Sequence, residues 1–421
     1  MQGINTLSGF GSTCGWAQKK NTFFVFLIAV FVPIAAYAGG LGIAALLGLG
    51  GLQAIIGLRR EYIVAPVRHI PISFWALFVF LLWGLISTLW SPYKSPETLS
   101  NPIKIFLGVP LYLGFAALVL TYVRRFGGQK LFVLITGFCF FSAILYLIDF
   151  STGFSFTRFL DPVEQGADPN IKFGNTVQNL GHGVVVLLLI SFPVMGRLWS
   201  IGGAGKTAAI FLAILVLFCG KLGEVDACIV ALILGFGAMG ITALRPKFGL
   251  WLSFTIAIFT IAFAPLIAFI ATKLSPEVKA HLPWSWEERV DNWAFLYTKI
   301  LNHPLFGNGF DAVRTYNETH DSRGYDKAIV SLHPHNGGIH IWLELGAIGA
   351  LLACIALYFS ARALTAPGRL SREQTIVVSG FVIAVALIAN ISFGVWQDWW
   401  WASIIYAGSL IAMVRPKNYR K

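Results

Sequence analysis

Three histidines and a glutamate stand at the beginning of one apolar segment of this chain. The stretch SLHPHNGGIHIWLELGAIGALL (331–352) contains His333, His335, His340 and Glu344. An imidazole has an ordinary pKa of about 6.5, so a neutral histidine can accept a proton near pH 7. His333 and His335 precede the apolar run, where the N-terminus of a helix would favour the neutral form. Their types and positions therefore indicate a general base.

Two other interpretations of this stretch compete with a base. Asn336 is a good N-cap, and on a helix that begins there Asn336, His340 and Glu344 share one face. We therefore expect His340 and Glu344 to form a hydrogen-bonded pair inside a helix bundle, although an ionisable Glu344 at membrane depth stays a functional candidate. Zinc is the second alternative. The spacing differs from HExxH and no cysteine is near, so we expect no metal or cofactor.

Most of the remaining chain is apolar. Its 421 residues are 57% hydrophobic and 12% charged, with a mean hydropathy of +0.73. Soluble domains carry about 25% charged residues, and a membrane-spanning helix needs about 20 apolar residues. We predict an all-α polytopic membrane protein in which 1–421 form a single integral membrane domain with about twelve transmembrane helices. The predicted spans are 22–38, 41–57, 70–90, 103–123, 131–149, 178–196, 207–220, 225–244, 249–272, 337–358, 376–392 and 399–414.

The distribution of basic residues predicts the orientation. Lys and Arg gather in alternate short segments, such as Lys19 with Lys20 and Arg124 with Arg125. Short basic segments stay cytoplasmic, so we expect a multi-pass membrane protein with both termini cytoplasmic. The net charge of +12 then reflects topology and gives no indication of nucleic acid binding.

The polar residues gather in two outer segments. A large loop (273–336) lies between the ninth and tenth spans, and a smaller one covers 149–177. Within the large loop an amphipathic helix is predicted at about 287–301, whereas 311–331 has no assignable element. The last outer loop carries Trp396 and Trp399–Trp401, which are typical of an aromatic belt but could also stack on sugars.

Several motifs together resemble a known family. They are RVDNW (289–293), HPLFGNGF (303–310), HPHN (333–336) and ELGAIGALL (344–352). This combination resembles the bacterial O-antigen ligase and O-antigen polymerase family, and twelve spans with a large loop before the tenth resemble the lipopolysaccharide O-antigen ligases. Two looser matches follow. Asn179 matches an Asn that begins a span in the family, and Lys221 stands where the family often has an arginine.

The resemblance implies a glycosyltransferase of GT-C-like architecture in the bacterial inner membrane, with its active site on the periplasmic side. It would transfer a polysaccharide from undecaprenyl pyrophosphate to a sugar hydroxyl of lipid A core, without a metal and with inversion. Membrane lipids would surround both substrates. His335 would be the base, with His333 second, and Arg289 would stabilise the pyrophosphate. The weaker cation candidates are Lys221, Arg158, Arg314 and Arg323, and the supporting residues are Asn336, Trp293, His340, Glu344 and Asn179. Alternatively, Arg289 forms a surface pair with Glu287, Glu288 or Asp291.

Three other functions compete with a ligase. An O-antigen polymerase would use the same donor with a second lipid-linked chain as acceptor. A protein O-glycosylation enzyme would need more chain after the last span. A polysaccharide or lipid exporter would bury polar residues at mid-membrane, whereas here they gather at the outer edge.

Overall fold

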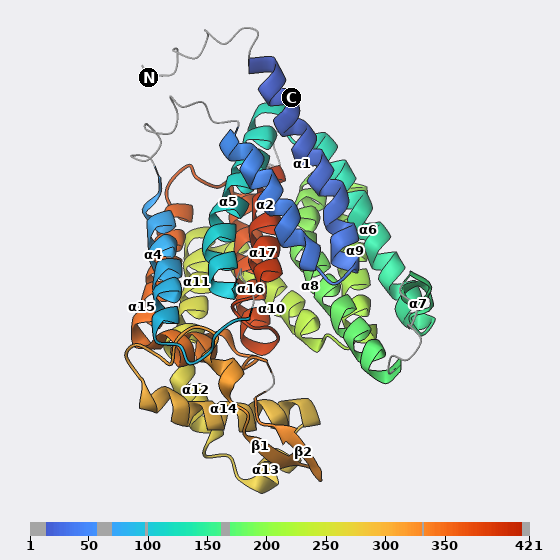
Figure 1. The fold of residues 1–421 in the computed structure, drawn as a ribbon. Helices are drawn as coiled ribbons and strands as arrows, with labels where there is room; N and C mark the ends of the chain where they lie inside the picture. The colour runs from blue at the N-terminus through green and yellow to red at the C-terminus, as the bar shows by residue number, and fades with distance from the viewer. Residues whose placement is uncertain (1–13, 57–69, 97–99, 161–168, 331, 415–421) are drawn as a thin grey trace. The chain divides into compact units, whose positions relative to one another are not determined.

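The computed structural model describes residues 14–56, 70–96, 100–160, 169–330 and 332–414. The chain forms two compact units. The first comprises 1–69, 108–224 and 401–415, and the second comprises 70–107, 225–400 and 416–421. Helices dominate both units, and the strands of the described residues form one hairpin (Figure 1).

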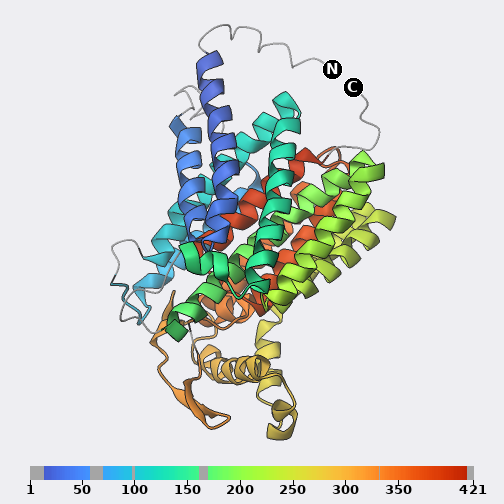
Figure 2. The same ribbon diagram turned by 90° about the vertical axis from the view of Figure 1, so that its right-hand side faces the viewer.

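The first unit is a bundle built around α8. Its helices are α1 (Cys14–Tyr37), α2 (Leu41–Ile56), α6 (Gln129–Ser151), α7 (Ser155–Leu160), α8 (Pro169–Ile201) and α9 (Gly203–Leu222). The boundary between the units falls inside α5 (Asn101–Phe126) and α17 (Asp398–Leu410, followed by η4, Ile411–Met413). Helix α8 packs against α1, α6 and α9, which run beside it (Figure 2).

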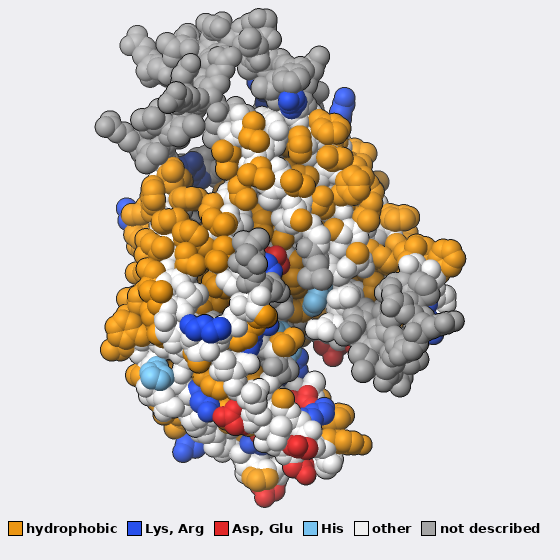
Figure 3. All heavy atoms as spheres, in the orientation of Figure 1, with side chains coloured by type: hydrophobic (Ala, Val, Ile, Leu, Met, Phe, Trp, Pro, Cys, Tyr) orange, Lys and Arg blue, Asp and Glu red, His pale blue; other side chains and the backbone are white. Residues whose placement is uncertain are grey.

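The second unit combines apolar helices with the large loop. Its long helices are α4 (Ile72–Ile86, followed by η2, Ser87–Leu89), α10 (Asp226–Leu244), α11 (Pro246–Ala262), α15 (Gly337–Leu364) and α16 (Arg372–Ile391). Between α11 and α15 lie α12 (Ala264–Ala271), α13 (Pro276–Ala280), α14 (Trp284–Asn302), η3 (Ala312–Thr315), β1 (Thr319–Ser322) and β2 (Tyr325–Ala328). Hydrophobic side chains cover the flank at α4 and α15, whereas charged ones gather over the large loop (Figure 3).

Each of the twelve predicted spans contains a helix. Among the described residues nine helices are long and apolar enough to cross a membrane, and the pair α11 and α12, bent by 52°, would make a tenth. Helices α2 and α17 are shorter. The protein is therefore an all-α, multi-pass membrane protein, while the number twelve and the GT-C-like architecture remain predictions.

Helix α14 forms because apolar residues recur on one side of a polar segment. Val290, Trp293, Leu296 and Ile300 are buried on that side, Glu287 lies in the first turn and Lys299 in the last. The buried side packs against α12, η3 and the beginning of α15 in one hydrophobic core. This core fixes α14 against the segment that carries the histidines.

Helix α15 is interrupted at Gly346, which has φ +64° and ψ −166°. The interruption is filled by the segment 304–309. Pro304 O accepts the Ala347 N–H at 2.8 Å, and the Gly309 N–H donates to Glu344 O at 2.9 Å. Trp83 Nε1 also donates to Leu345 O at 3.1 Å. The backbone groups freed by the break therefore find partners inside the protein, as an irregular segment at membrane depth requires.

The region 311–331, to which no element was assigned, contains the short helix η3 and the β1–β2 hairpin. Arg323 and Gly324 form its turn with φ +54° and +86°, values typical of a two-residue type I′ turn. Ser322 pairs with Tyr325, and His320 lies opposite Lys327. His320 and Lys327 therefore project from the same face of the hairpin.

Candidate active site

The two histidines of HPHN lie on a loop that α14 holds in place. Trp293 Nε1 donates to the carbonyl of Pro334 at 2.8 Å, and both groups are buried. Asn336 ends the loop as the N-cap of α15, since its Oδ1 accepts the Ile339 N–H at 2.9 Å. The loop is thus fixed at both sides of His335.

His335 has one ring nitrogen held and the other available. Its Nδ1 lies 2.7 Å from the carbonyl oxygen of Ser392, at the end of α16. A carbonyl only accepts, so Nδ1 carries the proton and the neutral ring has its lone pair on Nε2. Burial lowers the pKa of His335 below its ordinary value, and the nearby charge of Arg289 lowers it further, while the Ser392 contact and Glu288 oppose these effects. A His335 ring held in this way could accept a proton at Nε2.

His333 is less suited to this role. Its Nδ1 accepts the backbone N–H of His335 at 3.3 Å, and the two rings lie 4.3 Å apart. The side chain is buried against Gly394, where an added Cβ would lie 3.1 Å from the His333 Cβ. With the lone pair of Nδ1 engaged, a neutral His333 carries its proton on Nε2. The geometry therefore favours His335 over His333.

Arg289 does not form the surface pair with an acidic neighbour of its own helix that was considered as the alternative to a role in binding pyrophosphate. Each of those acidic residues has another partner. Arg323 binds Glu287 at 2.7 Å, Lys327 binds Glu288 at 2.7 Å and Lys279 binds Asp291 at 2.6 Å. Among the described residues Arg289 has no ion pair, so its positive charge is not neutralised by a carboxylate.

The contacts of Arg289 leave part of its guanidinium without a partner. One nitrogen, Nη1, donates to Ser285 O at 2.7 Å, and the group lies 5.5 Å from the ring centre of Trp286. Its Nε is buried without a hydrogen-bond partner in the described part of the chain. Burial lowers the pKa of Arg289, yet a guanidinium stays protonated at neutral pH. Arg289 is thus a half-buried cation whose charge lowers the pKa of His335.

The other predicted cations are arranged differently. Arg314 binds Asp311 at 3.1 Å and Arg323 binds Glu287, so both already have carboxylate partners. Lys221, in the last turn of α9, and Arg158, on α7, are exposed and belong to the first unit. Asn179 also belongs to that unit. It lies inside α8 and near the beginning of the apolar span Val177–Ile201.

His340 and Glu344 lie together on the buried face of α15, but the hydrogen bond predicted between them is absent. His340 Nε2 lies 3.3 Å from Glu344 Oε1 without the geometry of a hydrogen bond. Glu344 is fully buried, and it accepts the indole N–H of Trp396 at 2.6 Å. Burying a carboxylate costs less when donors surround it, so this group belongs to the framework of the site.

The aromatic belt predicted for the last outer loop is wrong for three of its tryptophans. Trp396, Trp399 and Trp400 are no more than 4% exposed, so they cannot line a membrane surface. Trp396 packs between Phe80 and Phe310 while its N–H reaches Glu344. The indole N–H of Trp396 therefore has a buried hydrogen-bond partner. The neighbouring residues in the sequence do not indicate this partner.

Asp311 is a charged residue of this region that the sequence analysis missed. It follows GNGF with φ +59° and is 5% exposed. Its carboxylate accepts bonds from Asn101 at 3.2 Å and Arg314 at 3.1 Å. Burial raises its pKa to about 6, the charge of Glu344 adds to this, and Arg314 opposes it. The only signal in the sequence is a lone acid after a glycine-rich turn.

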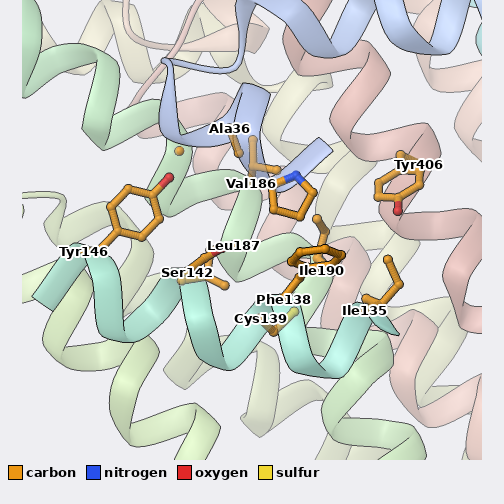
Figure 4. A pocket seen from close by; sticks show the side chains of 12 residues that line it. Ala36, Ile135, Phe138, Cys139, Ser142, Tyr146, Val186, Leu187, Ile190 and Tyr406 are labelled. Carbon is orange, nitrogen blue, oxygen red and sulfur yellow. The ribbon is translucent and has the colours of Figure 1, made fainter. Parts of the chain in front are cut away.

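A small cavity in the first unit contains none of the predicted site residues. Apolar side chains from α1, α6 and α8 line it together with Tyr146 and Tyr406 (Figure 4). No group of three or more His, Cys, Asp or Glu side chains within the described ranges is arranged to hold a metal ion. The metal-free site remains a prediction.

The chain is similar in sequence to known proteins. Residues 208–354 match the family model described as O-antigen ligase. Part of this chain is therefore similar in sequence to the O-antigen ligase family. A Rickettsia bellii protein named "Putative polysaccharide ligase" is 28% identical over 94% of this chain and 98% of its own length. A "putative polysaccharide ligase" from Rickettsia conorii is 27% identical over 87% of this chain and 84% of its own length. One from Rickettsia typhi is 28% identical over 80% of this chain and 80% of its own length. No solved structure matches.

The region that matches the O-antigen ligase model contains most of the arrangement around His335. It begins in α9 and ends in α15, so it includes α14, the hairpin, the histidine loop and the interruption at Gly346. Ser392, which holds His335 Nδ1, lies beyond it. The sequence similarity and the geometry therefore involve the same segment of the chain.

Proposed function

We propose that this protein is an O-antigen ligase of the bacterial inner membrane. It would transfer a polysaccharide from undecaprenyl pyrophosphate to a sugar hydroxyl of lipid A core at the periplasmic face. The observation that carries the proposal is the imidazole of His335, which the Ser392 carbonyl orients through Nδ1, together with Arg289, a cation with no acidic partner among the described residues. The sequence similarity to the O-antigen ligase family supports the substrate class.

The chemistry needs one base and one cation. The acceptor hydroxyl attacks the anomeric carbon as His335 Nε2 takes its proton, so a new glycosidic C–O bond forms. The bond from the anomeric carbon to the phosphate oxygen breaks, and its electron pair leaves with undecaprenyl pyrophosphate. Arg289 stabilises the negative charge that grows on that leaving group. A direct displacement of this kind inverts the anomeric carbon.

The test is complementation of a ligase-deficient strain that supplies a native lipid A core. The parent chain and His335→Asn are compared at equal membrane expression, and lipopolysaccharide is separated by electrophoresis. Asparagine tolerates the left-handed backbone of His335, so this change removes the base with little strain. The proposal predicts a polysaccharide ladder on lipid A core with the parent and none with the variant.

Two results would contradict it. A ladder from His335→Asn equal to that of the parent would exclude His335 as the base. Failure of the parent with a native core would exclude the ligase activity, and longer lipid-linked chains in the same cells would then identify a polymerase.

A further inference from the structure

The acidic side of α14 is covered by basic groups of the β1–β2 hairpin. Lys327 Nζ on β2 lies 2.7 Å from Glu288 Oε1, and Arg323 in the turn binds Glu287 at 2.7 Å. His320, opposite Lys327 on the same face of the hairpin, lies 3.7 Å from Asp291. The hairpin thus meets α14 through opposite charges.

The ammonium of Lys327 is oriented by more than its ion pair. It lies 3.8 Å from the ring centre of Trp284, in the first turn of α14. Trp284 Nε1 also donates to Ser322 Oγ at 2.8 Å, which ties the same ring to the hairpin. Lys327 is therefore fixed above Glu288 and differs from a freely moving surface lysine.

Glu288 lies next to one of the proposed site residues. It directly precedes Arg289, and its negative charge raises the pKa of both Arg289 and His335. Within the described part of the chain, the charged and titratable groups near His335 are Arg289 and Glu288 from α14 and His333 from its own loop, and Lys327 is paired with Glu288. An unpaired Glu288 would attract Arg289 and favour a protonated His335. Both changes would oppose the proposed chemistry.

Building on the function proposed above, we propose that Lys327 and Glu288 are positioning residues of the site. Their ion pair holds the Glu288 carboxylate toward the hairpin, so that Arg289 keeps its charge for the leaving group and His335 stays neutral. Lys327 thus acts through Glu288 and does not itself contact substrate.

The structure permits a charge-balanced test. More than a third of each of the two side chains is exposed. An exposed ion pair contributes little to the stability of the fold. We therefore expect Lys327→Met, Glu288→Gln and the double variant to fold. Lys327→Met leaves a negative charge near His335, Glu288→Gln leaves a positive one, and the double variant restores the net charge of the parent.

The measurement is the titration midpoint of His335 by NMR of the protein with isotope-labelled histidine in lipid nanodiscs. The signal is assigned by its absence from His335→Asn. We expect Lys327→Met to raise the midpoint by about one unit and Glu288→Gln to lower it. The double variant should return to the parent value. Equal midpoints in all four proteins, or a double variant displaced as far as Lys327→Met, would overturn the inference.

Transfer of polysaccharide is then measured for the same proteins across pH. The rate of Lys327→Met should fall most on the acid side and recover in the double variant. Since the midpoint is measured without turnover, unchanged midpoints in an active parent reject the positioning role alone. An inactive parent that still shows the expected midpoints rejects the ligase proposal instead.

Discussion

The Nδ1 atom of His335 donates to the carbonyl oxygen of Ser392 at 2.7 Å, across 57 positions of the chain. This contact fixes the tautomer and directs the lone pair of the ring to Nε2. It also ties the histidine loop to the end of α16. The orientation of the base is therefore built into the fold before any substrate binds.

Replacing the base should remove most of the turnover. We expect His335→Asn to lower kcat by about 100- to 10,000-fold, since general base catalysis contributes that much. The apparent melting temperature should change little, because asparagine adopts the positive φ of this position. Transfer assays on purified protein check the first expectation and thermal unfolding in detergent the second. His333→Asn, as the control, should lose less activity.

The acid limb of the pH profile should lie below the range of an ordinary histidine. Burial and Arg289 lower the pKa of His335, so the neutral base persists below pH 6.5 and is lost only as the pH falls through the lowered value. We expect kcat/KM for transfer to stay level down to about pH 6.5 and to decline at more acid pH. A limb above that value would argue against His335 as the titrating group.

Arg289 should matter more than the two paired arginines. We expect Arg289→Gln to lower kcat by about 100- to 1,000-fold, the usual loss when a group that stabilises developing negative charge is removed. Arg314→Gln and Arg323→Gln should cost less, because Asp311 and Glu287 already neutralise these side chains. Kinetics with a lipid-linked donor would separate kcat from KM. An Arg323→Gln variant as slow as Arg289→Gln would contradict this ranking.

The long helices and α14 follow from local patterns. Apolar runs predict the helices of both units, and the recurring apolar residues of α14 with Glu287 in its first turn predict a helix close to Trp284–Asn302. The cap at Asn336 is equally local, since its side chain bonds a backbone group three residues away. Such features depend on a few neighbouring residues.

The finer structure of the site depends on contacts between distant segments. Ser392, which orients His335, is an ordinary serine in the sequence, and the pairing of Glu288 with Lys327 requires a hairpin that no pattern predicted. The sequence around Trp396 is typical of a membrane surface, because its buried partner Glu344 lies 52 positions away in the chain. Sequence patterns identify the candidate histidines and cations. Only the fold shows that Ser392 orients His335 and that Arg289 has a buried Nε without a hydrogen-bond partner among the described residues.

Replacement of Gly346 should damage the fold strongly. Its φ of +64° and ψ of −166° fall in a region that is essentially restricted to glycine. A Cβ there would lie 2.3 Å from Leu305 O, a backbone atom that is held by the Ile348 N–H at 3.2 Å and cannot easily move. We therefore expect Gly346→Ala to reduce the free energy of unfolding well beyond the cost of backbone strain alone.

Gly324 supplies the matched control for this prediction. It also has a positive φ, +86°, but a Cβ there would meet nothing within 4 Å. Gly324→Ala should therefore cost only the backbone strain, about 1 to 3 kcal/mol. Thermal unfolding of both variants in the same detergent compares the two. Equal losses would show that backbone strain alone explains the glycine at 346. A much larger loss for Gly346→Ala would show that α15 can break there only because the segment 304–309 packs directly against its backbone.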